Sequence, residues 1–85
     1  MNILFSGAAR RDFEWFLDND KKLAQRIRRL LKDIIRNPEE GIGKPEKLKF
    51  QLAGYSSRRI NQEHRLIYRV EGDDVIVLSC RYHYE

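Results

Sequence analysis

A basic amphipathic segment in the middle of the chain constrains the fold more than any other feature of the sequence. Its apolar side chains recur at the spacing of one helical face, at Leu23, Ile27, Leu30, Leu31 and Ile34. Most of its other positions carry cations: Lys21, Lys22, Arg26, Arg28, Arg29, Lys32 and Arg36. Asp20 can cap a helix at its start, and Pro38 prevents its continuation. The sequence therefore predicts a helix over about 21–37 with one buried face.

The chain has 85 residues, which fits one small domain over 1–85. Its 17 Lys and Arg against 13 Asp and Glu give a net charge of +4, so anionic partners are expected. No apolar run approaches the ~20 residues that span a bilayer, and the N-terminal segment does not resemble a signal peptide. The lone Cys80 cannot form an intramolecular disulfide. We expect a folded, cytoplasmic protein without a membrane partner.

Shorter patterns predict the elements on either side of the basic helix. Residues 2–5 are typical of a strand, and Ser6 can cap a first helix over about 7–18. The C-terminal half alternates apolar and polar residues, with predicted strands at 56–62, 64–71 and 75–82. The expected fold class is α+β: an N-terminal strand, two helices, then a mainly antiparallel sheet with the helices on one face.

The phase of the last two strands predicts which of their side chains meet the helices. The expected inward sets are Leu66, Tyr68 and Val70 on one strand, and Ile76, Leu78 and Cys80 on the other. A three-residue turn then places Arg65 opposite Arg81 on the other face, with His83 diagonal to Arg65. Like charges opposed across a sheet cost stability, which favours an anion lying between them.

The polar face of this sheet carries the candidate catalytic groups. They are Arg59, Arg65, Arg81 and His83, together with Glu46, Lys47 and Lys49 from the preceding connection. A carboxylate, a histidine and several arginines suffice to cleave RNA without metal. A base takes the 2′-OH proton, that oxygen attacks the adjacent phosphorus, and an acid protonates the departing 5′ oxygen. Cations stabilise the negative charge that develops on the phosphoryl group.

Other chemistries have less support in the sequence. A His without Cys or carboxylate at ligand spacing makes a poor metal site, so neither a metal nor a cofactor is predicted. Cys80 falls on an apolar face and is expected to pack as a small hydrophobe rather than act as a nucleophile. The basic residues could also be solvated surface. Alternatively, they could belong to a noncatalytic RNA- or ribosome-binding module that blocks translation by occupancy; a DNA-binding helix is disfavoured because no helix-turn-helix spacing accompanies it.

Four blocks of sequence resemble one protein family. They are Gly43 to Lys49, Ser57-Arg58-Arg59-Ile60, Glu63 to Tyr68, and Cys80-Arg81-Tyr82-His83-Tyr84. In this order they resemble the YoeB/Txe branch of the RelE-like bacterial toxins, and the likeness runs over essentially the whole chain. The resemblance implies a fold similar to microbial ribonucleases and a single toxin domain. It further implies ribosome-dependent mRNA endonuclease activity, held in check by a YefM-like antitoxin.

The resemblance also implies a role for each matching residue. Glu46 would be the general base, His83 the general acid and Arg65 the main phosphate stabiliser. Lys49 and Arg59 would assist Arg65, and Tyr84 would position the RNA. Arg81 is a further candidate for phosphate or RNA binding because of its expected place on the polar sheet face. The basic helix would contact ribosomal RNA, with Lys22, Arg26 and Arg29 as the candidate contacts.

Two positions depart from the expected pattern, and several partners follow from the resemblance. Ser56 stands where many relatives are expected to have Trp, and Glu85 extends the chain beyond the usual terminal Tyr. The expected partners are the antitoxin, the ribosome and mRNA, with operator DNA contacted only through the antitoxin. A homodimer of this chain is a further candidate assembly.

Overall fold

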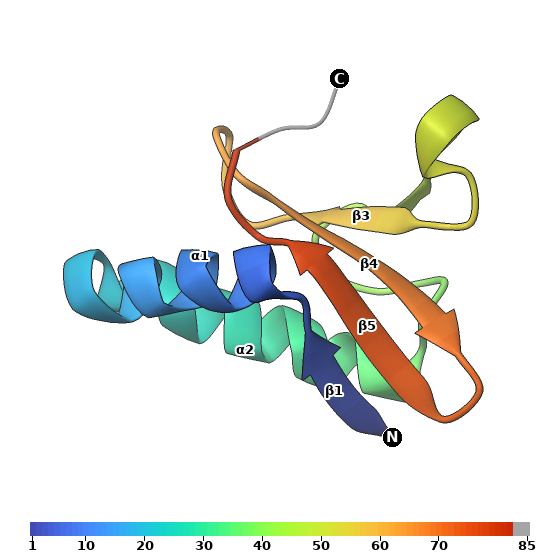
Figure 1. The fold of residues 1–85 in the computed structure, drawn as a ribbon, viewed down its shortest axis with the longest axis horizontal. Helices are drawn as coiled ribbons and strands as arrows, with labels where there is room; N and C mark the ends of the chain where they lie inside the picture. Colours follow the sequence, from blue (N-terminus) through green and yellow to red (C-terminus); the bar gives the residue numbers. More distant parts are fainter. Residues whose placement is uncertain (83–85) are drawn as a thin grey trace.

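The computed structural model of the protein describes residues 1–82, in which two helices and a five-stranded sheet follow the predicted order (Figure 1). The elements are β1 (Asn2–Phe5), α1 (Gly7–Asn19), α2 (Lys21–Arg36), β2 (Glu46–Lys47), the 3₁₀ turn η1 (Phe50–Leu52), β3 (Ser56–Arg59), β4 (Arg65–Glu71) and β5 (Asp74–Ser79). The strand order is β1-β5-β4-β3-β2. Among the strands of residues 1–82, only β1 pairs in parallel, with β5. This confirms the α+β class with a mainly antiparallel sheet.

Both helices begin at the predicted caps. The Ser6 hydroxyl accepts a hydrogen bond from the Ala9 N–H at 3.0 Å and donates one to the Leu78 carbonyl at 2.7 Å. The Asp20 carboxylate accepts from the Leu23 N–H at 3.2 Å. Such caps satisfy backbone donors that the helix itself leaves open, and each stabilises its helix by about 1 kcal/mol. Asp20 therefore ends α1 and caps α2, which places the bend between the two helices at this residue.

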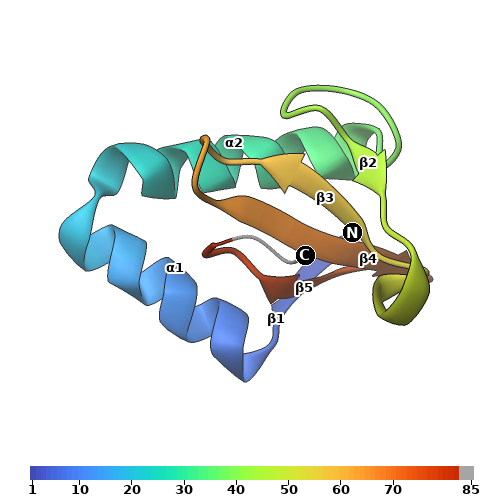
Figure 2. The same cartoon turned by 90° about the horizontal axis from the view of Figure 1, so that it is seen from above.

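The core lies between the two helices and one face of the sheet. Its buried members are Ala9, Phe16, Ala24, Ile27, Leu30, Leu31, Ile34, Ile60, Leu66, Tyr68, Val75, Val77 and Cys80. The predicted apolar face of α2 is thus confirmed, with Leu23 half-buried at its edge. Seen from above, α1 and α2 diverge as two arms of a V, with β4 running between them in projection (Figure 2). Within residues 1–82, no α-helix covers the other face of the sheet.

The predicted phase of β5 is wrong over most of the strand. Val75 and Val77 face the core instead of Ile76 and Leu78, which are half-buried. The turn contains two residues rather than three, because Glu71 pairs with Asp74, and this shifts the register by one. A bulge between Ile67 and Tyr68 then shifts it back. Cys80 consequently points into the core as predicted.

Two strands, β3 and β5, end earlier than predicted. The segment expected over 56–62 stops at Arg59, because the Asn61 side chain accepts from the Glu63 and His64 N–H groups and forms a turn. The segment expected over 75–82 stops at Ser79. Arg65 and Arg81 therefore do not form a strand pair, and the Arg65 N–H instead donates to the Tyr82 carbonyl at 3.1 Å.

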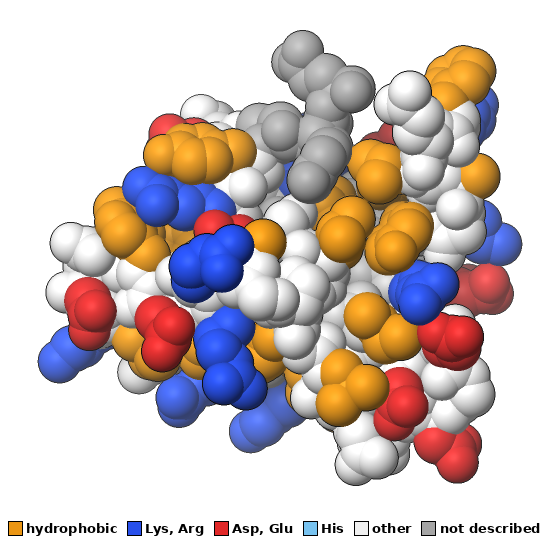
Figure 3. Space-filling model, viewed as in Figure 1, with side chains coloured by type: hydrophobic (Ala, Val, Ile, Leu, Met, Phe, Trp, Pro, Cys, Tyr) orange, Lys and Arg blue, Asp and Glu red, His pale blue; other side chains and the backbone are white. Residues whose placement is uncertain are grey.

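Charge is distributed unevenly over the surface. In the view of Figure 3, Lys and Arg side chains gather over the helices, whereas acidic side chains gather at the turn that joins β4 to β5. Apolar side chains appear between them, over the sheet. Within residues 1–82, neither helix is long and apolar enough to cross a membrane.

Candidate active site

The helix-free face of the sheet brings together groups from β2, β3 and β4. Glu46 pairs with Ser57, and Ser57 pairs with Ile67, so these three side chains share a face. Arg59 pairs with Arg65 two residues further along the same strands. The period of two therefore places Glu46, Ser57, Arg59 and Arg65 on one surface, as the sequence predicted for the carboxylate and the two arginines.

Arg65 is the best-anchored of these side chains. Its Nη1 lies 3.7 Å from Glu46 Oε2 and donates a hydrogen bond to Ser57 Oγ at 3.3 Å. The Arg65 side chain is 19% exposed, whereas that of Glu46 is 65% exposed. The guanidinium is thus held against the sheet while the carboxylate reaches solvent. This arrangement combines a fixed cation with an accessible proton acceptor.

Ser57 is a site residue that was not predicted from its residue type. It is fully buried, and its hydroxyl is one of the contacts that orient Arg65. Its position on the same face as Glu46 and Arg65 follows from strand alternation once the register is known. Strand alternation is therefore the sequence signal that could have identified Ser57.

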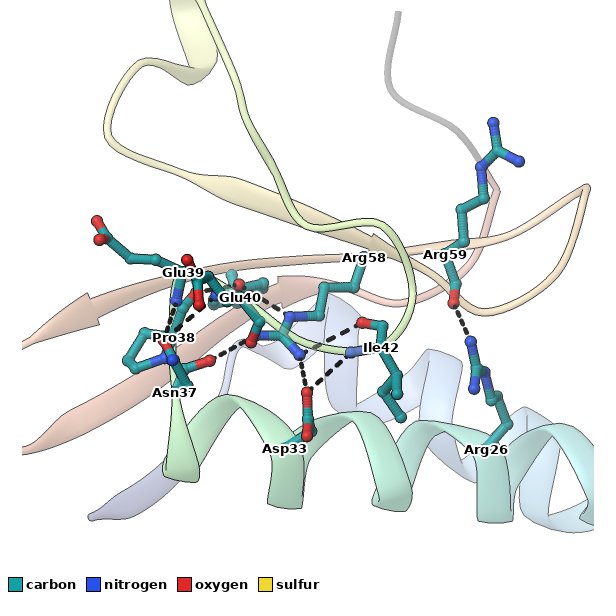
Figure 4. A network of polar contacts seen from close by, with 10 residues as sticks. Arg26, Asp33, Asn37, Pro38, Glu39, Glu40, Ile42, Arg58 and Arg59 are labelled. Atoms are coloured by element: carbon teal, nitrogen blue, oxygen red, sulfur yellow. Dashed lines mark hydrogen bonds and ion pairs between the residues drawn. The ribbon is translucent and has the colours of Figure 1, made fainter.

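Arg59 is exposed at the end of β3, and its backbone is fixed on both sides. Its N–H donates to the Gly43 carbonyl at 2.6 Å, and its carbonyl accepts from Arg26 Nη2 at 3.2 Å (Figure 4). Arg26 therefore braces β3 against α2, in addition to any role in contacting a ribosome. The other two candidate ribosome contacts, Lys22 and Arg29, are exposed on α2.

Arg58 holds the connection that delivers Glu46 to the sheet. Its side chain is fully buried and donates to Asp33 Oδ2 at 2.5 Å. The same guanidinium donates to the backbone carbonyls of Asn37, Glu40 and Ile42, at 2.6, 3.0 and 3.3 Å (Figure 4). These carbonyls follow the end of α2, where the chain must turn back toward β2. One buried cation thus organises the whole turn, a role the sequence did not reveal.

Asp33 completes this network as an ionised partner. The backbone N–H of Ile42 and then the guanidinium of Arg58 lower the pKa of its carboxyl below the ordinary value of 3.8. A lowered folded-state pKa contributes stability that is complete above the ordinary value and is lost as pH falls through the folded-state value. The turn is therefore expected to weaken only in acid, below about pH 4.

Gly41 is required where this turn passes Asp33. Its φ is +134°, and a Cβ there would lie 1.8 Å from Asp33 Oδ2. We predict that Gly41→Ala lowers the free energy of unfolding by about 3 kcal/mol, measured by urea denaturation. Gly54→Ala is the matched control, since Gly54 also has positive φ but has open space around its Cβ position, and should cost about 1–2 kcal/mol. Equal losses for the two variants would show that the positive φ alone, without the contact to Asp33, explains why glycine is needed at position 41.

The remaining cations predicted for the site lie at different distances from it. Lys49 is exposed directly before η1, two residues after β2. Arg81 lies with its guanidinium 3.7 Å from the centroid of the Trp15 ring and 4.9 Å from that of Tyr82. Its cation is thus engaged by aromatic rings beside α1, so its contact with RNA stays a prediction. His83, Tyr84 and Glu85 lie outside the described residues.

Cys80 is buried and chemically quiet, as predicted. Burial, assisted by the Asp12 carboxylate, raises the pKa of its thiol to about 12. Only about one thiol in 10⁴ would then be ionised at pH 8, and the thiolate is the reactive form. We predict that iodoacetamide leaves Cys80 unlabelled in the folded protein at pH 8 and labels it rapidly in urea. Equal labelling rates, measured by mass spectrometry, would contradict this placement.

Nowhere in residues 1–82 do three His, Cys, Asp or Glu side chains gather closely enough to hold an ion. The groups that do converge are a carboxylate, a hydroxyl and guanidinium cations, which suit proton transfer and phosphate binding.

The fold and this open sheet face define a compact α+β protein with a cationic surface site. Residues 5–84 match the model of the YoeB-like toxin of bacterial type II toxin-antitoxin systems. Toxin YoeB of Synechocystis sp. (strain ATCC 27184 / PCC 6803 / Kazusa) is 53% identical over 85 residues, covering 100% of this chain and 99% of the relative. The chain therefore belongs to the YoeB-like toxin family.

Solved structures agree with this assignment. In the heterotetrameric YoeB–YefM toxin–antitoxin complex from Staphylococcus aureus, the matching chain is 55% identical with a TM-score of 0.92, covering 99% of this chain and 98% of that one. The YoeB dimer from the same organism matches with a TM-score of 0.93, 55% identity and the same coverage. The protein is thus a toxin of a type II toxin–antitoxin system, as the sequence blocks indicated.

Proposed function

We propose that this toxin is an endoribonuclease that cleaves ribosome-bound mRNA. The observation that carries the proposal is the Glu46–Arg65 pair, in which an exposed carboxylate lies 3.7 Å from an anchored guanidinium on an open sheet face. A proton acceptor beside a fixed cation is what attack of a 2′-OH on its neighbouring phosphate requires. An RNA-cleaving activity would also be harmful to the cell, which agrees with membership of a toxin family.

The proposed reaction uses the substrate's own hydroxyl as nucleophile. Glu46 accepts the 2′-OH proton, and the 2′ oxygen forms a bond to the adjacent phosphorus. Arg65, assisted by Lys49 and Arg59, stabilises the added negative charge on the phosphoryl oxygens. His83 then gives a proton to the departing 5′ oxygen. The products are a 2′,3′-cyclic phosphate, which can hydrolyse to a 3′-phosphate, and a 5′-OH end.

The exposure of the site supports dependence on the ribosome. Glu46 and Arg59 are both exposed on the sheet surface. An exposed site offers few contacts to order a flexible RNA, so a second surface would present the strand in a reactive geometry. The exposed cations of α2, including Lys22 and Arg29, provide a face that would bind ribosomal RNA phosphates.

The expected protein partner is a YefM-like antitoxin. The S. aureus relative forms a heterotetramer with YefM, and another solved structure of that relative is a dimer. A segment that folds on binding could neutralise this toxin by covering or distorting the sheet face. Operator DNA would be contacted through the antitoxin, and a homodimer of this chain is a further expected state.

The test is to map mRNA ends after the toxin is added to programmed ribosomes. The proposal predicts new 5′-OH ends within the ribosome-bound stretch and none on the same mRNA free in solution. A noncatalytic inhibitor, which the basic surface of α2 could also support, would stop translation without new ends. Translation arrest with intact mRNA would therefore replace the proposed function with inhibition by occupancy.

A further inference from the structure

The connection between β2 and β3 carries an aromatic side chain that projects into solvent. Figure 1 shows η1 standing away from the sheet at the start of β3, and Figure 2 shows it clear of both helices. Phe50 is the first residue of η1 and is 92% exposed, more than any other large apolar side chain in residues 1–82. Single exposed apolar side chains are common on protein surfaces, so exposure alone assigns no role to Phe50.

The backbone of Phe50 has a conformation that disfavours its own side chain. Its φ is +59°, in the left-handed region that Gly and Asn adopt more readily than bulky residues do. Burial of the ring does not offset this strain, because the ring lies in solvent. Backbone strain of this kind clusters at binding and active sites. Asn or Gly would suit the turn better than Phe, which indicates that the ring serves binding rather than folding.

Backbone hydrogen bonds fix the turn on both sides of the ring. They join the N–H of Leu48 to the carbonyl of Tyr55 at 2.9 Å, that of Leu52 to Lys49 at 3.1 Å, and that of Ala53 to Phe50 at 3.0 Å. The Phe50 side chain is therefore carried by a backbone that is already ordered. A partner that stacks on this ring does not have to order the turn first, which favours binding.

The same turn joins the ring to the candidate active site. Glu46 precedes Phe50 by four residues, so their Cα atoms lie within about 14 Å of each other. The strand that follows the turn, β3, carries Ser57 and Arg59. The exposed Lys49 lies directly before Phe50 in the chain. Proteins that bind single-stranded RNA combine such cations, which contact the backbone, with aromatic rings on which bases stack.

We propose that Phe50 binds mRNA by stacking on an unpaired base close to the cleaved bond. An aromatic ring offers a flat apolar face to any base, and Lys49 supplies a cation for the neighbouring phosphate. An apolar protein segment would also cover the ring, but this cation and the short path to Glu46 favour the mRNA strand. The inference rests on the proposed function, because it adds a contact to the same substrate.

Two variants separate the ring from the turn. Phe50→Asn removes the ring and suits the left-handed backbone, so its melting temperature should equal or exceed that of the wild type. Phe50→Trp keeps an aromatic face. Binding is measured on ribosomes programmed with mRNA whose ribosome-bound nucleotides are 2′-deoxy, which blocks attack by a 2′-OH. We expect Phe50→Asn to raise Kd at least about 5-fold and Phe50→Trp to change it less than about 3-fold.

Removing single bases from the mRNA identifies the partner of the ring. Each ribosome-bound base is removed in turn, leaving its sugar and phosphate in place. At one position near the cleaved bond, the loss should weaken wild-type binding at least about 5-fold and make the wild type and Phe50→Asn bind equally.

Three results would overturn the stacking role. They are equal Kd values for the wild type and Phe50→Asn on intact mRNA, a difference that persists on every abasic mRNA, and a large fall in the melting temperature of Phe50→Asn. These measurements do not require cleavage. A toxin that cleaves nothing but shows the base-dependent difference would therefore refute the proposed function and retain the stacking contact, whereas cleavage without that difference would refute the stacking contact alone.

Discussion

Replacing Glu46 by Ala is expected to slow cleavage of ribosome-bound mRNA by about 10²–10⁴-fold, the range typical of losing a general acid or base. Glu46 is exposed and makes one long contact to Arg65, so its loss should leave the fold intact. The rate is best measured in single turnover with saturating ribosome–mRNA complex, where binding is complete. His83→Ala should lower the same rate to a similar extent.

Glu71→Ala is the matched control for Glu46. Glu71 is also an exposed carboxylate on a strand and contacts an arginine, Arg69, at 2.9 Å, but it lies at the turn to β5. Its removal should change the cleavage rate less than about 2-fold. Wild-type rates for both Glu46→Ala and His83→Ala would contradict the assigned proton transfers.

Arg58→Met is expected to destabilise the fold strongly. The change leaves the carbonyls of Asn37, Glu40 and Ile42 without their shared donor and removes the charge partner of Asp33. Removing one member of a buried charged network is strongly destabilising, and we expect a loss of about 3 kcal/mol in the free energy of unfolding. That loss lowers the folding equilibrium constant roughly 100-fold.

Arg29→Met tests whether the effect of Arg58→Met depends on burial. Arg29 is exposed on α2, so its replacement should change stability by less than about 0.5 kcal/mol. Urea unfolding of both variants, followed by circular dichroism, gives the comparison. If Arg58→Met destabilised the protein no more than Arg29→Met, the turn after α2 would not depend on Arg58.

The helical half of the fold was predictable because its signals are local. Ser6 and Asp20 cap the helices that follow them, and a repeat of 3–4 residues marks the buried face of α2. The phase of β5 was not predictable, because it depends on the length of one turn and on a bulge at Ile67 and Tyr68. A one-residue change in either exchanges the two faces of a strand.

The shared face of Glu46, Arg59 and Arg65 was predictable from the sequence, whereas the residues that support it were not. Arg58 and Arg59 are chemically identical neighbours, yet one is fully buried and the other exposed. Which one faces Tyr68 and the turn after α2 depends on strand pairing, which composition does not contain. The His64 ring accepts a hydrogen bond from the Tyr82 backbone N–H, a contact that no pattern in the sequence indicates.

A single 2′-deoxy substitution in the mRNA distinguishes attack by the substrate's own 2′-OH from any other route of cleavage. The 2′-OH of the nucleotide preceding the mapped cleavage point would be replaced by hydrogen in an mRNA bound to the ribosome, with a substitution three nucleotides away as control. We predict that the first substitution abolishes cleavage at that point and that the second leaves it unchanged. Continued cleavage at the deoxy position would show that the reaction does not proceed by 2′-OH attack, and Glu46 would then not be the acceptor of the 2′-OH proton.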